Sequence, residues 1–376
     1  MPPAATRPHV PSTLFAAFEL GNKEWIVAMT PRIEQPPVMR HLPARALDVL
    51  ALELARTKTH FALPADAPVW SCYEAGRDGF WLHRYLASQG VRNRVVDSAS
   101  IEVNRRQRRS KTDRLDARKL VTMLIRAESG EPRVWQVVTV PTLAEEDQRQ
   151  VHRELLVARR DRARHVQRIK SLLATQGVPL ARIRDLASHL ATARLWDGTL
   201  VPPRLAARLE REHAAITEAT ARIGALKRER RALLRTRGDP AIAQVRQLHQ
   251  LRGIGLDSAW LYVMEFFAWR QFRNRRQVGG LAGLTDTHFR SGALRHELGI
   301  SKAGNRWVRA LAINTAWAWL RFQPQSALAR WYETRFGRGT SDQRKIGIVA
   351  LARKLLIAFW RYLTTGVVPE GAVLRS

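Results

Sequence analysis

The pattern of apolar and polar positions divides the chain into a first third with strands and a helical remainder. In residues 12–140, short apolar runs alternate with stretches of helical periodicity. We predict strands at residues 14–20, 25–30, 68–73, 91–96 and 134–138, and helices at 45–56, after Gly76 and at 113–126. Strands that alternate with helices after an opening hairpin indicate an α/β domain. A Pro-rich tail at residues 1–11 is predicted to be disordered.

Residues 141–238 have the spacing of a long helical hairpin. Apolar residues first follow steps of three, four and seven, and later repeat every seven. The earlier set is Leu156, Ala163, Val166, Ile169 and Leu173, and the later sets are Leu209, Ile216 and Ile223, and Ala219, Leu226 and Leu233. The seven-residue repeat favours a coiled coil, with Pro202-Pro203 between its arms. The excess of Arg between residues 159 and 168 suggests contact with a nucleic-acid backbone.

Residues 239–376 are predicted to be helical, without strand alternation and with a long helix at 342–363. Gly253-Ile254-Gly255 marks a turn between two helices. Such a turn can present backbone N–H groups to phosphate, as in a helix-hairpin-helix. It is equally consistent with an ordinary tight turn, because a lone Gly-x-Gly is a weak signal.

Charge and composition narrow the class of partner. The 376 residues include 63 Lys and Arg against 33 Asp and Glu, a net charge of +30 spread along the chain. Such a field attracts polyanions, and nucleic acid is the expected partner. An acidic membrane surface is the competitor, but no lipidation motif or isolated amphipathic anchor supports it. The chain also has no run of about 20 apolar residues that could span a bilayer. The single cysteine, Cys72, excludes a disulfide framework and fits a reducing cytoplasm.

A pair of carboxylates stands in one of the most basic stretches, Lys111-Thr112-Asp113-Arg114-Leu115-Asp116-Ala117. Residues three apart share a helix face, so Asp113 and Asp116 are predicted to project together and could hold a divalent cation. The basic residues beside them could hold a phosphate backbone; they are Arg105, Arg106, Arg108, Arg109 and Lys111. The simpler interpretation is a solvated helix start, where acidic residues are favoured.

Two more acidic residues end predicted strands. Glu19 ends the first strand, and Glu74 ends the strand at 68–73. Because sites gather at the strand ends of such sheets, we expect them to join Asp113 and Asp116 in a site for two Mg²⁺ ions. A turn-capping role for Glu74 and a surface role for Glu19 are the alternatives. Histidine spacing does not predict a zinc site, and Cys72 is predicted to lie in the core.

A serine near the middle of the last third could act as a nucleophile. Ser291 is followed by Gly292 and flanked by Arg290 and Arg295, with Lys302 further on. A serine in a glycine-bounded loop among cations could attack phosphorus, with the cations stabilising the developing charge. From the residues alone, a simple Ser-Gly turn is the more common outcome.

Five blocks of the sequence together resemble the DEDD transposases of bacterial insertion-sequence family one-hundred-and-ten. They are Cys72-Tyr73-Glu74-Ala75-Gly76, Lys111 to Ala117, Gly283-Leu284 leading to Ser291-Gly292, Ser301-Lys302-Ala303-Gly304-Asn305, and Ala352-Arg353-Lys354-Leu355-Leu356. The blocks stand in the family's order, and the resemblance covers nearly the whole chain.

The resemblance implies a RuvC-like, RNase H-fold domain at residues 12–140, whose acidic residues Glu19, Glu74, Asp113 and Asp116 bind Mg²⁺, with Mn²⁺ as a substitute. It implies a coiled-coil arm at 141–238 that serves assembly, and a transposase domain at 239–376 with Ser291 as the catalytic serine. Members are similar to recombinases that use a non-coding bridge RNA to choose donor and target DNA. They work as dimers that assemble into a tetramer, and the serine becomes linked to DNA. We expect a bacterial, cytoplasmic, nucleoid-associated enzyme.

Two positions depart from the family pattern. The first acidic residue is normally Asp, whereas Glu19 adds one methylene, and Mg²⁺ is strict about octahedral geometry. Either the site tolerates Glu19 or this copy is impaired. Arg252 stands where Pro is usual. The alternative function is a metal-dependent, RuvC-like, structure-selective endonuclease that uses the carboxylates without a covalent intermediate.

Overall fold

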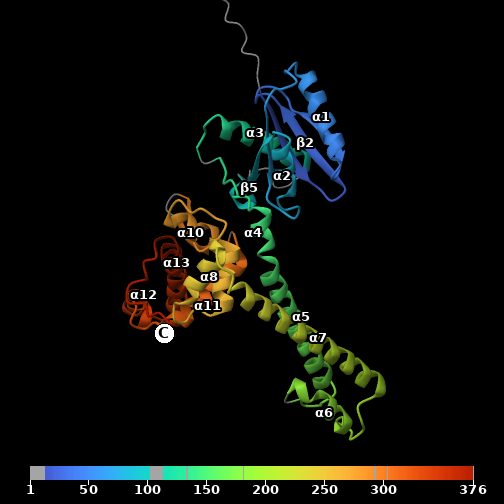
Figure 1. The fold of residues 1–376 in the computed structure, drawn as a ribbon, viewed down its shortest axis with the longest axis vertical. Coiled ribbons are helices and arrows are strands. Elements are labelled where there is room, and N and C mark those ends of the chain that lie inside the picture. Colours follow the sequence, from blue (N-terminus) through green and yellow to red (C-terminus); the bar gives the residue numbers. More distant parts are fainter. Residues whose placement is uncertain are drawn as a thin grey trace, which may run out of the picture. The chain divides into compact units, whose positions relative to one another are not determined.

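The computed structural model describes residues 13–101, 113–132, 134–180, 182–291, 294–302 and 304–375, so the predicted tail at 1–11 lies outside the described residues. The chain divides into two compact units, the first ending at Pro141 and the second beginning at Thr142. The predicted arm and the C-terminal region belong to one unit (Figure 1).

The first unit is built on a five-stranded mixed sheet. Its strands are β1 (Leu14–Leu20), β2 (Glu24–Thr30), β3 (Val38–Pro43), β4 (Val69–Glu74) and β5 (Arg92–Val96), in the order β3-β2-β1-β4-β5. The first three form an antiparallel meander, and β4 and β5 run parallel to β1. Helices α1 (Leu47–His60) and α2 (Trp81–Ser88) pack on one face, and α3 (Asp113–Glu128) packs on the other. The predicted α/β class is confirmed for this unit.

The strand predictions for this unit missed one strand, β3, and included one that does not form. β3 was not predicted, because it is an edge strand of sequence VMRHLP in which only Leu42 is buried. The strand predicted at residues 134–138 does not form. The segment touches the edge of β5 through one antiparallel bridge between Val96 and Val137. Val137 is 50% exposed, so the segment lacks the buried side chains that would hold a longer strand against β5.

The second unit begins with the predicted helical hairpin. Its helices are α4 (Leu143–Asp147), α5 (Gln150–Ala174), α6 (Leu186–Thr192) and α7 (Pro203–Leu233). α5 and α7 lie side by side along the arm, with α6 at its outer end (Figure 1). The predicted heptad residues Leu209, Ile216 and Leu226 are buried on α7. Pro203 occupies the first turn of α7, where its missing N–H costs nothing.

The inward face of α5 differs from the predicted one near the base of the arm. Leu155 and Ala158 are buried against Leu226 of α7, whereas Ala163 is exposed. Leu156 instead packs on the C-terminal helices. The predicted single stripe fails here because the base of α5 lies between two partners, α7 and the C-terminal core, and both faces are covered.

Ion pairs fasten the base of the arm to the C-terminal helices. Arg153 of α5 makes two hydrogen bonds to the carboxylate of Glu265, at 2.9 and 3.0 Å, and Glu265 is only 2% exposed. Arg230 of α7 is also buried; it donates to Asp257 at 2.7 Å and lies over the ring of Trp260. Each pair joins a helix of the arm to the segment of residues 256–267.

Arg153→Ala is expected to destabilise the protein by about 3 kcal/mol, because it leaves the Glu265 carboxylate buried without its cation. Glu265→Gln should cost less, about 1 kcal/mol, since the remaining Arg153 side chain is 41% exposed and regains water. Urea unfolding of both variants measures the difference. Arg164→Ala, which breaks the exposed pair with Asp161, is the control and should cost under about 0.5 kcal/mol. Equal losses for Arg153→Ala and Glu265→Gln would refute this account.

His152 makes the same junction sensitive to acid. Both ring nitrogens are buried without a hydrogen-bond partner, and burial lowers the pKa of His152 to about 4 from its ordinary 6.5. Glu265 and Asp257 face the ring and oppose this shift, whereas Arg153 and Arg230 add to it. Between about pH 6.5 and 4 the unfolded chain binds a proton that the folded chain refuses, so stability falls as the pH falls.

The wild-type protein is therefore expected to lose about 3 kcal/mol more stability between pH 6.5 and 4 than the His152→Leu variant. The variant removes the titrating group and fills the site with an apolar side chain. Urea midpoints at the two pH values provide the measurement. Parallel losses in the two proteins would show that another group carries the acid sensitivity.

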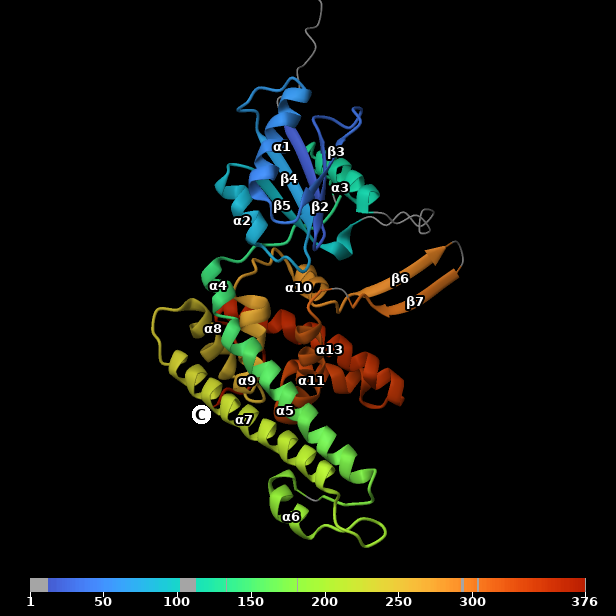
Figure 2. The same cartoon turned by 90° about the vertical axis from the view of Figure 1, so that its right-hand side faces the viewer.

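The remaining elements form a helical bundle with one β-hairpin. They are α8 (Pro240–His249), α9 (Leu256–Tyr262), the π-helical turn η4 (Val263–Phe267), α10 (Arg275–Leu281), β6 (Asp286–Ser291), β7 (Leu294–Ile300), α11 (Arg306–Phe322), α12 (Ala327–Tyr332), a second π-helical turn η5 (Glu333–Gly337) and α13 (Ser341–Thr365). α13 confirms the predicted long helix. The hairpin extends outward from the bundle (Figure 2), and it contradicts the expectation of a region without strands.

Candidate active site

Two predicted ligands, Glu19 and Glu74, stand in one row across neighbouring strands. The parallel register places Ala17 of β1 opposite Cys72 of β4, and both side chains are buried against α3. Side chains alternate between the faces of a strand, so two residues later Glu19 and Glu74 lie on this same face. Glu19 is half-buried and Glu74 is exposed.

The first turn of α3 lies toward the same edge of the sheet. The guanidinium of Arg94 lies 5.0 Å from the ring of Trp70, near the amino end of β4, and pairs with Glu128 at 3.0 Å. Glu128 is the last residue of α3, so the helix ends at the amino edge of the strands. Its first turn, with Asp113 and Asp116, therefore points toward the carboxyl edge, where β1 and β4 end in Glu19 and Glu74.

Glu19, Glu74 and Asp116 lie toward one edge of the sheet but do not form a closed cluster among the described side chains. The side chain of Asp113 lies outside the description, and Asp116 is half-buried. Across the described part of the chain, no three Asp, Glu, His or Cys side chains come close enough to hold a metal ion. The donors are carboxylate oxygens, which Mg²⁺ prefers, so the residue types fit the ion. The four-ligand site stays a prediction.

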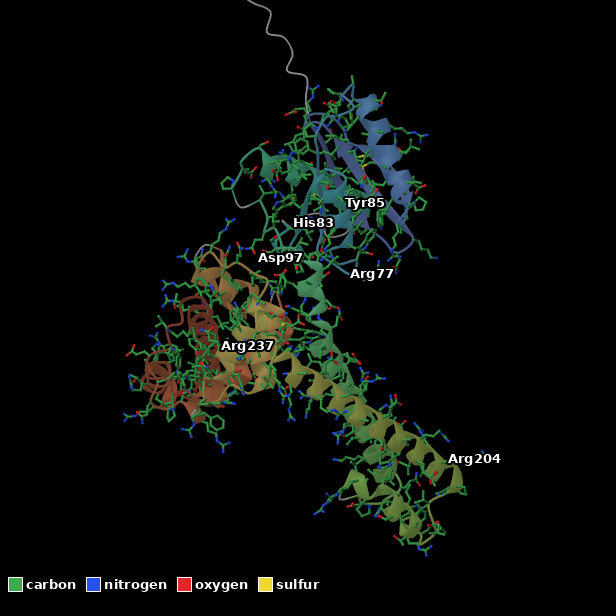
Figure 3. The ribbon with its side chains drawn as sticks, viewed as in Figure 1. Arg77, His83, Tyr85, Asp97, Arg204 and Arg237 are labelled. Atoms are coloured by element: carbon green, nitrogen blue, oxygen red, sulfur yellow. The ribbon has the colours of Figure 1, made fainter. Side chains whose placement is uncertain are left out.

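Asp97 is an acidic residue at this edge that the strand pattern did not single out. It follows β5 directly and is labelled in Figure 3. Its backbone N–H donates to Gln136 O at 2.8 Å, which fixes the chain as it leaves the sheet. An acidic residue immediately after the predicted strand at 91–96 was the available signal.

Cys72 is fully buried, as predicted, and burial raises the pKa of its thiol, which keeps it inert.

Ser291 is the last residue of β6, beside the two-residue connection of the hairpin. In the antiparallel register of the two strands, Ser291 lies opposite Leu294 of β7, and Arg290 lies opposite Arg295. The prediction of an irregular loop here was wrong, since the backbone is a strand. The missed signal was a two-residue, Gly-containing link, Gly292-Ala293, which favours a hairpin. The side chains of residues 287–291 and 294–298 lie outside the description.

The base of the hairpin is fastened by the block Ser301 to Asn305. Ser301 N donates to Thr285 O at 2.8 Å, and Asn305 N donates to Leu281 O at 3.2 Å. A Cβ at Gly304 would meet Leu281 O at 2.1 Å, so only glycine permits this approach. The Asn305 side chain caps α11. This block of the resemblance therefore positions the hairpin on α10 and α11.

The predicted nucleic-acid contacts are only partly visible. Arg105, Arg106, Arg108, Arg109 and Lys111 lie outside the described residues, as do the side chains of Arg290 and Arg295. Lys302 is exposed at the base of the hairpin and has a positive φ of 55°.

The Gly253-Ile254-Gly255 turn does connect two helices, α8 and α9. Ile254 is fully buried, and Gly253 is packed against Phe322, with 3.0 Å between the Phe322 Cβ and an added Cβ. The carboxylate of Asp257 stands in the first turn of α9. A tight packing turn, rather than a phosphate site, accounts for these contacts.

The amino-acid sequence matches known transposases. Residues 245–331 match the family described as "Transposase IS116/IS110/IS902 family". The protein named "Putative transposase y4rJ" of Sinorhizobium fredii is 38% identical, over 99% of both chains. The chain belongs to this transposase family. A protein named "Transposase for insertion sequence element IS1328", of Yersinia enterocolitica, is 27% identical over 56% of this chain and 60% of its own length.

In this transposase, the matched residues 245–331 contain the hairpin of Ser291 and the turn between α8 and α9. The carboxylate edge of the sheet lies in the first unit, which the match to y4rJ also covers. None of the helices in the described ranges is both long and apolar enough to cross a membrane.

Proposed function

We propose that this transposase is a site-specific DNA recombinase of an insertion sequence, guided by a non-coding bridge RNA and acting through Ser291. The observation that carries the proposal is that the chain contains two features, one in each unit. One is the row of Glu19 and Glu74 beside the first turn of α3, and the other is a serine beside the tip of a basic hairpin. The mixed sheet with helices on both faces supports the RuvC-like, RNase H-like assignment of the first unit.

Glu19, Glu74, Asp113 and Asp116 would hold Mg²⁺, with Mn²⁺ as a substitute. The bound ion supplies charge neutralisation at a scissile phosphate. The carboxylates themselves give the edge of the sheet a local negative charge within a chain of net charge +30. A cation held at this edge would offset that negative charge.

Ser291 would supply the nucleophile. Its Oγ forms a bond to phosphorus while the bond from phosphorus to the leaving strand's oxygen breaks; the serine loses its proton, and the leaving oxygen gains one. Arg290 and Arg295 lie opposite each other in the strand register, next to Ser291. They would stabilise the charge that develops on the phosphate oxygens. The number of phosphoester bonds is unchanged, so the later attack by a second DNA strand needs no nucleotide cofactor.

The partners in this proposal are donor DNA, target DNA, the bridge RNA and further copies of the chain, as dimers that assemble into a tetramer. The net charge supports polyanionic partners. The direct test is to sequence the RNA that co-purifies with the protein expressed from its natural flanking DNA. A single enriched, structured RNA from beside the reading frame is expected. Recombination by protein stripped of RNA would contradict guidance.

A further inference from the structure

Three of the five Arg residues at positions 159–168 of α5 are paired with carboxylates within the protein. Arg159 donates to Asp257 at 2.7 Å, Arg164 pairs with Asp161 at 3.1 Å, and Arg168 pairs with Glu212 at 3.3 Å. A phosphate that contacted this stretch would have to compete with carboxylates in place. For these three residues, the structure therefore weakens the expectation of contact with a nucleic-acid backbone.

A different row of cations stands at the base of α7. This basal stripe consists of Lys227, Arg228, Arg231 and Arg235, all exposed. At 100° per residue the four side chains fall within an arc of about 100° on one side of α7 and the turn that follows it. In the described part of the chain, no salt bridge includes any of the four. α7 runs from near Arg204 at the outer end of the arm toward Arg237 at the bundle (Figure 3).

The other sides of α7 are balanced by acidic residues. Arg222 pairs with Glu218 on the opposite side, and Glu229 lies on that side as well. Arg230 points inward and is held by Asp257. Within the last three turns of α7, positive charge without an acidic neighbour is therefore confined to the basal stripe.

Two simpler explanations cover only part of the pattern. Cations in the last turn of a helix stabilise its dipole, which accounts for Arg231 but not for Lys227 and Arg228, one turn earlier. A membrane surface would call for apolar residues beside the charges, and the stripe has none. Gly224 stands at the same angular position, one turn before the stripe, and the Arg228 guanidinium lies over it, with 3.5 Å between Arg228 Nη1 and an added Cβ.

We propose that the basal stripe binds the phosphate backbone of a nucleic-acid duplex laid along the base of α7. Lys227 and Arg231 are four residues apart, about 6 Å along the axis, so the stripe is a straight row that suits consecutive phosphates and reads no base. The inference rests on the proposed function only in that the family acts on nucleic acid; it requires neither Ser291 nor a metal ion.

The test is the salt dependence of duplex binding by the full-length protein in EDTA, measured by fluorescence anisotropy. One triple variant is Lys227→Gln, Arg231→Gln and Arg235→Gln. The matched control, Arg164→Gln, Arg168→Gln and Arg222→Gln, removes the same charge from residues that have acidic partners. Each phosphate contact contributes about 0.9 to the slope of log affinity against log salt. The stripe variant should lose about 2.7 of slope, and the control under about 1.

Between about 50 and 200 mM salt, the wild type should therefore lose roughly 40-fold more affinity than the stripe variant. Parallel titrations with duplex DNA and duplex RNA identify the source of the phosphates, and a reduced slope with either supports the proposal. Unchanged slopes with both, or equal reductions in the two triple variants, would overturn it. Ser291→Ala should keep the wild-type slope, so loss of recombination in that variant is a separate result.

Discussion

Ser291→Ala is expected to abolish recombination between a donor and a target plasmid, with a fall of at least about 10³-fold in rate. The variant removes one oxygen at the end of β6 and leaves the backbone pairing with Leu294 intact. Ser291 is the only serine among residues 286–300 of the sequence, so the proposed phosphoserine link is lost. The measurement is the yield of recombinant plasmid over time, together with the amount of protein bound covalently to DNA after denaturation.

Ser301→Ala is the matched control for this variant. Ser301 lies at the base of the same hairpin, where its backbone N–H bonds to Thr285 O, and that bond survives the change. Recombination by the control should stay within about threefold of wild type. Full recombination by Ser291→Ala would remove the serine from the mechanism. Cleaved DNA without attached protein in that variant would instead favour the structure-selective endonuclease.

Asp116→Asn is expected to cost about 10³-fold in recombination, because it removes a charge from the edge that would hold Mg²⁺. Asn has the same shape, so the packing of Ala117 and Leu120 behind it is kept. Recombination is measured across a titration of Mg²⁺ and of Mn²⁺, and DNA binding is measured in parallel. Binding should be retained while activity is lost.

Glu19→Asp provides the counterpart at the same edge. It restores the shorter acid that the resemblance leads us to expect, and should keep or raise activity, whereas Glu19→Gln should lower it. Wild-type recombination by Asp116→Asn in limiting Mg²⁺ would exclude Asp116 as a ligand.

The sequence predicted those parts of the fold whose burial follows a simple period. The buried strands around Ala17 and Cys72 have short apolar runs, and α13 has a continuous helical pattern. β3 was missed because Leu42 is its only buried side chain, and the hairpin of Ser291 was missed because Gly292-Ala293 was not interpreted as a hairpin link. At the base of the arm, Leu156 packs on one partner and Leu155 on another, so no single periodicity describes α5.

The site could be predicted only in part for a related reason. Strand ends locate Glu19 and Glu74, and helix spacing pairs Asp113 with Asp116, but the shared edge follows from the register of β1 with β4 and from the direction of α3. The occupied Arg residues of α5 show the same limit. Their acidic partners, such as Asp257 for Arg159, come from distant parts of the chain.

The most direct measurement of the central claim is mass spectrometry of the protein trapped during the reaction with donor and target DNA. After nuclease and trypsin digestion, the peptide of residues 291–295 lies between two Arg cleavage points. The account predicts that this peptide carries a nucleotide bound through phosphate to the Ser291 Oγ. Recombined DNA formed with this peptide unmodified, or with the nucleotide on another residue, would contradict it.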